Sequence, residues 1–242
     1  MKIKSITHAA LALLTAGMAF GIDLPVAVEK DPRVQSEGKR WRLDQATVTD
    51  PARPRVLLIG DSILNGYLGT VIKRLKGRAY VDAWVNPYCQ GESYNALLAE
   101  VLKQGPYDVI HFNMGLHGFQ KDNAGQPRIP DGRFEPLTKA FVEVMKNANP
   151  NAKIIWASTT PISKRDTPME LDPESNAIII EHNRMAAKVM AEMNVPVNDL
   201  YALMISHPEM KQNDFHWKDP AKKLQGEACA DAILKVLPEK RQ

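Results

Sequence analysis

The sequence contains few of the residues that build disulfide frameworks and metal sites. Its 242 residues include two cysteines, Cys89 and Cys229, and six histidines. No C-x-x-C, H-E-x-x-H or calcium-loop pattern occurs, so no motif indicates a metal ion, and we expect no cofactor. Two cysteines carry no spacing signature, and either a disulfide between them or two small buried side chains fits the sequence; we favour the second.

The charge shows only a small excess of one sign. Lys and Arg number 31 and Asp and Glu number 28, which gives a formal net charge of +3. The basic residues are scattered along the chain rather than gathered in a run. Proteins that follow a nucleic-acid backbone carry a basic stripe or patch. The sequence therefore argues against nucleic acid as a partner.

No apolar run is long enough to span a membrane, which takes about 20 residues. The best candidate, AALALLTAGMAFG at 9–21, is shorter and follows two lysines, as in a signal peptide. Cleavage after Ala19 or Gly21 would leave small residues at the positions that a signal peptidase reads. We expect residues 1–21 to be a signal peptide and the mature protein to be periplasmic or secreted, with no membrane span. The alternative is a buried first helix.

After this segment we expect a lead-in at 22–52 and one domain at 53–242. The lead-in is rich in Pro, Asp, Glu and Arg and has weak periodicity, so we expect it to wrap the surface. In the domain, short apolar runs alternate with amphipathic stretches. Strands are predicted at 55–62, 79–86, 107–115, 152–161 and 195–203, and helices at 67–77, 93–105, 135–150, 173–194 and 219–237. This alternation indicates a parallel five-stranded sheet with helices on both faces.

Residues suited to catalysis follow the predicted strands. Ser62 closes the first strand in VLLIGDSILNG, and the second and third strands run into NPYCQGES and NMGLHG. NDFHWKD, which contains Asp214 and His216, precedes the last helix. In open α/β sheets, ligands bind beyond the carboxyl ends of the strands. GDS alone is also typical of a turn or helix cap, but together these segments supply a nucleophile, an acid–base pair and backbone donors for acyl transfer.

The order of these blocks resembles that of the SGNH (GDSL) hydrolase family. GDS closes the first strand, a Gly-containing loop follows the second, GLHG follows the third, and a carboxylate lies beside a His before the last helix. DVIHFNMGLHG and NDFHW are most similar to a subgroup with DVIHFNxGLH and DVHF-like blocks. The resemblance covers 55–237. It implies an α/β fold, a flavodoxin-like three-layer α/β/α sandwich with a central, mostly parallel five-stranded sheet, and ester hydrolysis as the activity.

The resemblance implies a role for each catalytic residue. Ser62 would be the nucleophile, and His216 the base that takes its proton and later protonates the leaving alcohol. The acid of the family usually lies three residues before this His, where this chain has Asn213. Asp214, two residues before, matches the DVHF variant, so we expect it to orient His216. The alternative is a Ser–His pair whose His is held by a backbone carbonyl.

The resemblance also implies an oxyanion hole. Its donors would be the amides of Ser62 and Gly91 and a side chain from the third block. The common form of that block is Gly-x-Asn-Asp, and GLHG places His117 at the Asn position. Either His117 donates a ring N–H to the oxyanion, or Asn113 donates its side-chain amide. One such donor is typically worth about 3 kcal/mol of barrier.

We therefore expect an exported serine esterase that hydrolyses small acyl esters, with O-acetyl groups on carbohydrate as the preferred substrate. The segments 119–134 and 163–172 are predicted to form walls of the site. The alternatives are an acyltransferase or a (lyso)lipase with the same triad, and a non-catalytic carbohydrate-binding or assembly protein on this fold. An α/β-hydrolase is excluded because Leu64 occupies the second Gly position of Gly-x-Ser-x-Gly. The Gly-x-Gly-x-x-Gly turn of dinucleotide-binding proteins is also missing.

Overall fold

The computed structural model describes residues 42–122 and 124–240. The predicted signal peptide, 1–21, and the first part of the lead-in, 22–41, lie outside the described residues. Within those residues, no helix combines the length and the apolar character that a membrane span requires. The same part of the chain contains no group of three or more His, Cys, Asp or Glu side chains that could hold a metal ion.

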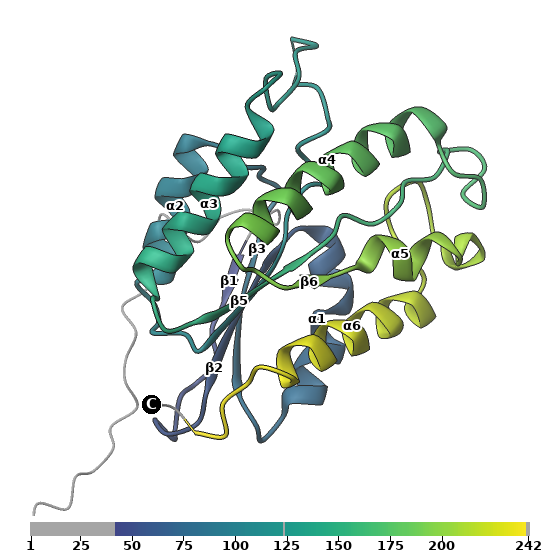
Figure 1. The fold of residues 1–242 in the computed structure, drawn as a ribbon. Coiled ribbons are helices and arrows are strands. Elements are labelled where there is room, and N and C mark those ends of the chain that lie inside the picture. Colours follow the sequence, from purple (N-terminus) through teal and green to yellow (C-terminus); the bar gives the residue numbers. More distant parts are fainter. Residues whose placement is uncertain (1–41, 123, 241–242) are drawn as a thin grey trace, which may run out of the picture.

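A six-stranded sheet forms the centre of the fold (Figure 1). Its strands stand in the order β1-β3-β2-β4-β5-β6; β1 is antiparallel to β3, and all other neighbours are parallel. The strands are β1 (Arg42–Asp44), β2 (Arg55–Gly60), β3 (Tyr80–Val85), β4 (Val109–Asn113), β5 (Lys153–Ala157) and β6 (Val197–Asn198). The predicted, mostly parallel sheet is confirmed, with one strand more than the five expected.

Helices cover both faces of the sheet (Figure 1). One face is covered by α1, α5 and α6, and the other by α2 and α3 with most of α4. The helices are α1 (Ser62–Leu75), α2 (Glu92–Leu102), α3 (Phe134–Ala148), α4 (Pro173–Glu192), α5 (Leu200–Ile205) and α6 (Asp219–Leu234), with a 3₁₀ turn at Pro208–Met210. The predicted three-layer α/β/α architecture is confirmed.

The central strand β2 contributes to two hydrophobic cores. Leu57 and Ile59 pack with residues of α2 and α3, whereas Val56 and Leu58 pack with residues of α1 and α6. All four side chains are fully buried. A parallel strand that is covered on both faces needs apolar residues at every position, which explains the uninterrupted run VLLI and fixes Ser62 at its carboxyl end.

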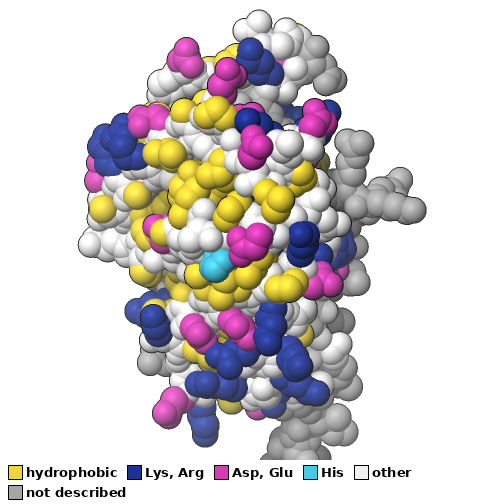
Figure 2. All heavy atoms as spheres, turned by 90° about the vertical axis from the view of Figure 1, so that its right-hand side faces the viewer, with side chains coloured by type: hydrophobic (Ala, Val, Ile, Leu, Met, Phe, Trp, Pro, Cys, Tyr) yellow, Lys and Arg dark blue, Asp and Glu magenta, His cyan; other side chains and the backbone are white. Residues whose placement is uncertain are grey.

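The run Ile178–Ile180 in α4 leaves apolar side chains on the surface. Successive helical residues are about 100° apart around the axis, so Ile179 is fully buried while Ile178 and Ile180 are 43% and 52% exposed. Figure 2 shows hydrophobic side chains gathered over the middle of one side of the molecule, with Lys, Arg, Asp and Glu side chains around them. The surface therefore combines an apolar area with a surrounding region of mixed charge.

The edge strand β1 comes from the segment that the sequence analysis assigned to the lead-in. It pairs with the second half of β3, and the chain that follows stays on the same edge of the sheet. The backbone N–H of Ala46 donates to Asp82 Oδ1 at 2.9 Å, and that of Asp50 donates to the Tyr80 hydroxyl at 2.8 Å. The described part of the lead-in thus covers the exposed edge of β3.

The segment 195–203 differs from its prediction. Only Val197–Asn198 forms a strand, and a helix begins at Leu200. Asp199 caps this helix, because its carboxylate accepts the backbone N–H of Ala202 at 3.0 Å. The prediction of a strand through residue 203 was therefore wrong beyond Asn198.

The two cysteines are both free thiols. Cys229 is fully buried in α6, and burial raises the pKa of its thiol to about 12. Cys89 is partly buried in the loop before α2. Cys229 thus fits the favoured interpretation of a small buried side chain, and no disulfide joins the two residues.

Candidate active site

The corner between β2 and α1 places Ser62 at the carboxyl end of the central strand. Asp61 Oδ1 accepts a backbone N–H of the first helical turn at 2.8 Å, so Asp61 caps α1 and Ser62 is its first residue. The Ser62 side chain is exposed. Gly60 permits the corner, because a Cβ there would lie 2.7 Å from Leu64 Cβ and 3.2 Å from the carbonyl oxygen of Asn113. Ser62 therefore follows a close approach of β2 to the end of β4.

His216 lies in a short hairpin, 210–218, that precedes α6. The hairpin is closed by a hydrogen bond from the backbone N–H of Lys218 to the carbonyl oxygen of Met210 at 2.8 Å. His216 Nε2 lies 2.9 Å from Ser62 Oγ. The fold thus brings the two predicted residues, which are 154 positions apart in the sequence, into hydrogen-bond contact.

The other ring nitrogen of His216 is held by Asn213. His216 Nδ1 lies 3.2 Å from Asn213 Oδ1. The same oxygen accepts the backbone N–H groups of Phe215 and His216, at 3.0 Å and 2.7 Å. An amide oxygen can only accept a hydrogen bond, so Nδ1 carries the ring proton. Nε2 is then unprotonated and can accept the hydroxyl proton of Ser62.

This contact differs from the predicted one, in which Asp214 orients the ring. Asp214 Oδ2 instead lies 3.5 Å from Nε of Arg165, and Asp214 Oδ1 accepts the backbone N–H of Phe215 at 3.2 Å. The cause is local: the Asn213 side chain folds back over the hairpin toward the residues that follow it, as Asn side chains do in turns. Asp214 faces the 163–172 segment and acts on His216 through its charge.

The surroundings of His216 favour its neutral form. Burial lowers the pKa of His216 below its ordinary value of 6.5; the Asp214 carboxylate raises it, and the cations Lys211 and Lys222 lower it. A general base must be unprotonated to act. Asp61, beside the serine, is also affected by burial, which raises the pKa of its carboxyl to about 6. The site therefore holds an imidazole that is ready to accept a proton at neutral pH.

The candidate oxyanion donors lie around the same strand ends. Gly91 is the residue before α2, and a Cβ there would meet only the Cys89 carbonyl oxygen, at 4.0 Å, so the space beside its Cα is open. Asn113 is buried, and its side-chain Nδ2 lies 3.5 Å from the carbonyl oxygen of Ser158. The pKa of His117 is lowered by burial and by the charges of Arg128 and His216. His216 is among the charges that act on the His117 ring, so the two imidazoles lie in the same part of the molecule.

The two segments predicted to form walls lie beside these residues. The backbone N–H of Ser163 donates to the carbonyl oxygen of Asp214 at 2.9 Å, which joins 163–172 to the His216 hairpin. In 119–134, Ile129 packs so close to Gly118 that a Cβ there would lie 2.8 Å from Ile129 Cδ1. Both segments therefore contact the chain next to candidate site residues.

Sequence reasoning missed Lys211. This lysine is fully buried beside the His216 hairpin, and its ammonium lies 4.0 Å from the centre of the Trp217 ring. Lysine side chains are almost always exposed, and no local pattern in the sequence marks this one. Lys211 is followed by three further polar residues, Gln212, Asn213 and Asp214, so its surroundings in the sequence gave no signal of burial.

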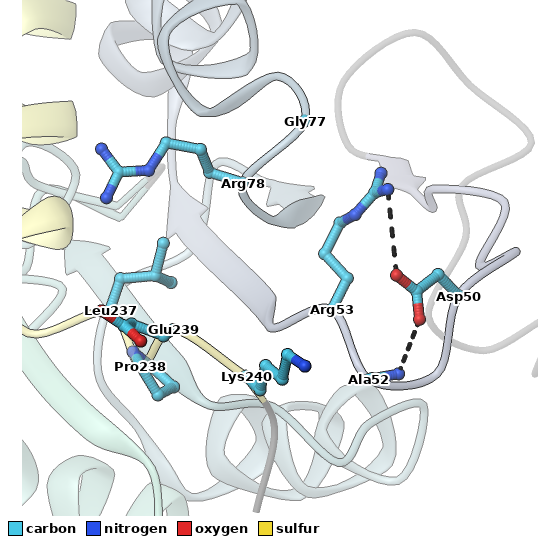
Figure 3. A pocket seen from close by; sticks show the side chains of 9 residues that line it. All are labelled: Asp50, Ala52, Arg53, Gly77, Arg78, Leu237, Pro238, Glu239 and Lys240. Carbon is cyan, nitrogen blue, oxygen red and sulfur yellow. Dashed lines mark hydrogen bonds and ion pairs between the residues drawn. The ribbon is translucent and has the colours of Figure 1, made fainter.

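A separate pocket of about 370 Å³ lies away from these residues (Figure 3). It is lined by Asp50, Ala52, Arg53, Gly77, Arg78, Leu237, Pro238, Glu239 and Lys240. Asp50 accepts the backbone N–H of Ala52 at 3.0 Å and lies 3.9 Å from Arg53. The residues that precede β2 and β3 line this pocket, so it lies at the amino ends of the strands, opposite the Ser62 corner. It contains none of the predicted site residues.

The fold is that of known esterases and lipases. No protein-family model and no curated protein matches the sequence. Among solved structures, an acetyl xylan esterase, AlAXEase, superposes with a TM-score of 0.61 at 16% identity, over 74% of this chain and 99% of that one. A lipase/acylhydrolase from Enterococcus faecalis gives 0.61 at 20% identity, over 78% and 100%. The aryl esterase of M. smegmatis gives 0.58 at 15% identity, over 76% and 100%.

These likenesses, which also include a GDSL-like lipase from Bacteroides thetaiotaomicron, identify the class of fold. The chain has the α/β/α fold of the SGNH (GDSL) hydrolases. Its GDS corner and its His216 hairpin occupy the ends of the fold at which ligands bind in open α/β sheets.

Proposed function

We propose that this protein is a serine ester hydrolase. The observation that carries the proposal is the 2.9 Å contact between Ser62 Oγ and His216 Nε2. Asn213 holds the opposite ring nitrogen and so fixes the tautomer that accepts the serine proton. A nucleophile, a base and an orienting group joined in this order are the parts of an acyl-transfer triad, in which Asn can replace Asp.

In the proposed reaction, Ser62 Oγ attacks the carbonyl carbon of the ester while His216 takes the hydroxyl proton. The tetrahedral intermediate collapses, His216 gives that proton to the alkoxide oxygen, and the alcohol leaves an acyl-serine. Water then attacks the acyl-serine as His216 takes one of its protons. The second intermediate collapses, the proton returns to Ser62 Oγ, and the carboxylic acid is released.

We assign the oxyanion donors to the backbone N–H groups of Ser62 and Gly91 and to the His117 ring. The open space beside the Cα of Gly91 and the influence of the His216 charge on the pKa of His117 support this assignment. The alternative donor, Asn113, is buried and directs its amide toward Ser158. Each donor would stabilise the negative charge that develops on the carbonyl oxygen of the ester.

The substrate that we propose is a small acyl ester, with O-acetyl groups on carbohydrate preferred. The exposed position of Ser62 suits an ester on a bulky polymer. One protein of the same fold is named an acetyl xylan esterase. Export by the predicted signal peptide, to the periplasm or the exterior, would bring the enzyme to extracellular polysaccharides.

The chain-length preference tests this proposal. We expect the purified protein to release acetate from acetylated xylan and to cleave p-nitrophenyl acetate faster than p-nitrophenyl palmitate. Faster cleavage of the palmitate would favour the lipase alternative, and acetyl transfer to an added acceptor sugar would favour the acyltransferase. A folded protein that cleaves none of these esters but binds the polysaccharide would favour the non-catalytic alternative.

Substitutions at Asn213 and Asp214 distinguish the two candidate orienting residues. Asn213→Ala is expected to lower kcat/KM by about 100-fold or more, because the ring loses its fixed tautomer. Asn213→Asp places a carboxylate at Nδ1 and raises the pKa of His216, so activity is lost at a higher pH on acidification. Asp214→Asn removes a carboxylate that raises this pKa, so activity persists to a lower pH with little change in its plateau. In the wild type, kcat/KM is expected to fall on acidification with a midpoint below pH 6.5.

The pH dependence of kcat/KM reports these pKa values for the free enzyme. Gln212→Ala is the matched control, because Gln212 belongs to the same hairpin and its side chain is exposed. A larger loss of plateau activity in Asp214→Asn than in Asn213→Ala would show that Asp214 is the orienting residue.

A further inference from the structure

Lys211 is a buried cation that forms no ion pair with a carboxylate of the described residues. Its side chain is 2% exposed. Within residues 42–122 and 124–240, its Nζ donates hydrogen bonds only to backbone carbonyl oxygens: Pro161 at 2.5 Å, Asp214 at 3.2 Å and Phe215 at 3.3 Å. The Trp217 ring covers another side of the ammonium at 4.0 Å. Every acceptor of this cation is therefore a main-chain group or an aromatic face.

These acceptors belong to two segments that are far apart in the sequence. Pro161 lies in the loop after β5, whereas Asp214 and Phe215 directly precede His216. A second link joins the same segments, because Trp217 Nε1 donates to Thr160 Oγ1 at 3.4 Å. The ammonium thus ties the backbone before His216 to the carboxyl end of the sheet, where Ser62 also lies.

Stability alone does not account for this arrangement. Taking an ammonium out of water costs several kcal/mol, and apolar residues of similar size often fold as well or better at such positions. The three carbonyl bonds offset part of that cost. A charged group at this place is better explained by what it does to the neighbouring hairpin, because proton transfer is sensitive to errors of about 1 Å in the placement of reacting groups.

We propose that Lys211 is a positioning residue of the proposed hydrolase: its buried ammonium holds the backbone of Asp214 and Phe215, and thereby His216 Nε2, within reach of Ser62. This inference rests on the proposed function, since it concerns the same Ser62–His216 pair. The hydrogen bonds of Lys211 go to the loop after β5 and to the backbone of Asp214 and Phe215, so its effect passes through the His216 hairpin.

The charge of Lys211 has a second, measurable effect. Four other charged or titratable groups surround His216: Asp214, which raises its pKa; Lys222 at the start of α6, which lowers it; His117 in the loop after β4; and Arg165, paired with Asp214. Burial lowers the pKa of Lys211 to about 7, and Asp214 opposes that shift. Lys211 is therefore charged in the acidic range where His216 takes up its proton, and it opposes that protonation.

A fluorophosphonate probe tests the proposal without knowledge of the natural ester. Ser62 Oγ displaces fluoride from phosphorus, and His216 takes the serine proton, so the labelling rate measures activation of Ser62. We expect Lys211→Met to slow labelling by about 10- to 100-fold and to move its acid limb to higher pH. Lys211→Gln keeps an N–H donor without the charge. Its labelling rate should therefore fall less than that of Lys211→Met, while the acid limb of its pH profile should move to the same higher pH. Lys211→Gln also tests the proposal if Lys211→Met does not fold.

Lys218→Met is the matched control. Lys218 is exposed on the same hairpin, and its Nζ also donates to a backbone carbonyl, that of Glu209 at 2.9 Å; it should label like the wild type. Absence of labelling at Ser62 in the wild type would overturn the proposed function itself. If the wild type is labelled and the Lys211 variants keep its pH profile, Lys211 has at most a structural role and the inference is wrong.

Discussion

Replacement of Ser62 by Ala is expected to lower kcat/KM for p-nitrophenyl acetate by about 10⁴- to 10⁶-fold. The variant has no hydroxyl to form the acyl-serine, and only direct attack by water remains. The backbone donors at residues 62 and 91 are unchanged, so a small rate above the uncatalysed reaction should persist. Steady-state kinetics, with circular dichroism to confirm the fold, measure this loss.

His216→Ala should cause a loss of similar size, and the double variant little more, because a nucleophile and its base act as one unit. Ser206→Ala is the control, since Ser206 is an exposed serine at the end of α5. Two independent, additive losses for Ser62 and His216 would contradict a shared proton-transfer step. Unchanged activity in Ser62→Ala would reject the mechanism.

The second large effect concerns stability and is expected for Asp82→Asn. Asp82 pairs with Arg55 between β3 and β2; Oδ2 lies 2.6 Å from Nη2, and the side chains are 1% and 5% exposed. The Tyr107 hydroxyl also donates to this carboxylate, at 3.0 Å. The substitution removes the charge that pairs with the buried Arg55 guanidinium. We expect the free energy of unfolding to fall by about 3–5 kcal/mol, as measured by urea denaturation.

An exposed ion pair provides the comparison. Arg74 and Asp231 join α1 to α6 on the surface, with side chains 47% and 54% exposed. Arg74→Met should change the free energy of unfolding by less than about 1 kcal/mol. Replacing both partners of the buried pair, with Arg55→Met and Asp82→Leu, should recover part of the stability lost in Asp82→Asn. A loss in Asp82→Asn no larger than that in Arg74→Met would contradict this account.

Much of the fold could be predicted because its signals are local. The run at 56–59 is apolar at every position, as a strand covered on both faces requires. The amphipathic stretches between the strands became helices close to their predicted bounds, except that α1 begins at Ser62 rather than at residue 67. The order of strands and helices then placed Ser62 and His216 at one end of the sheet. There the His216 hairpin brings Nε2 to 2.9 Å from Ser62 Oγ.

Other features depend on contacts that the local sequence does not encode. Whether Asn213 or Asp214 faces the ring depends on the turn geometry of a hairpin, and the two differ by a single position. The strand β1 has three residues and exists because the edge of β3 accepts it. The burial of Lys211 depends on the loop after β5, about 50 residues earlier in the chain. Each is set by tertiary packing.

The placement of Ser62 and His216 at the starts of two neighbouring helices suggests how substrate range could be engineered. Ser62 begins α1 and His216 precedes α6, and these helices pack so closely that a Cβ on Gly226 would lie 2.5 Å from Thr70 Cβ. The segment 119–134 belongs to neither helix. If the proposed function holds, a mutant library confined to that segment, a predicted wall of the site, is expected to change ester specificity while the helix pair keeps the Ser62–His216 contact.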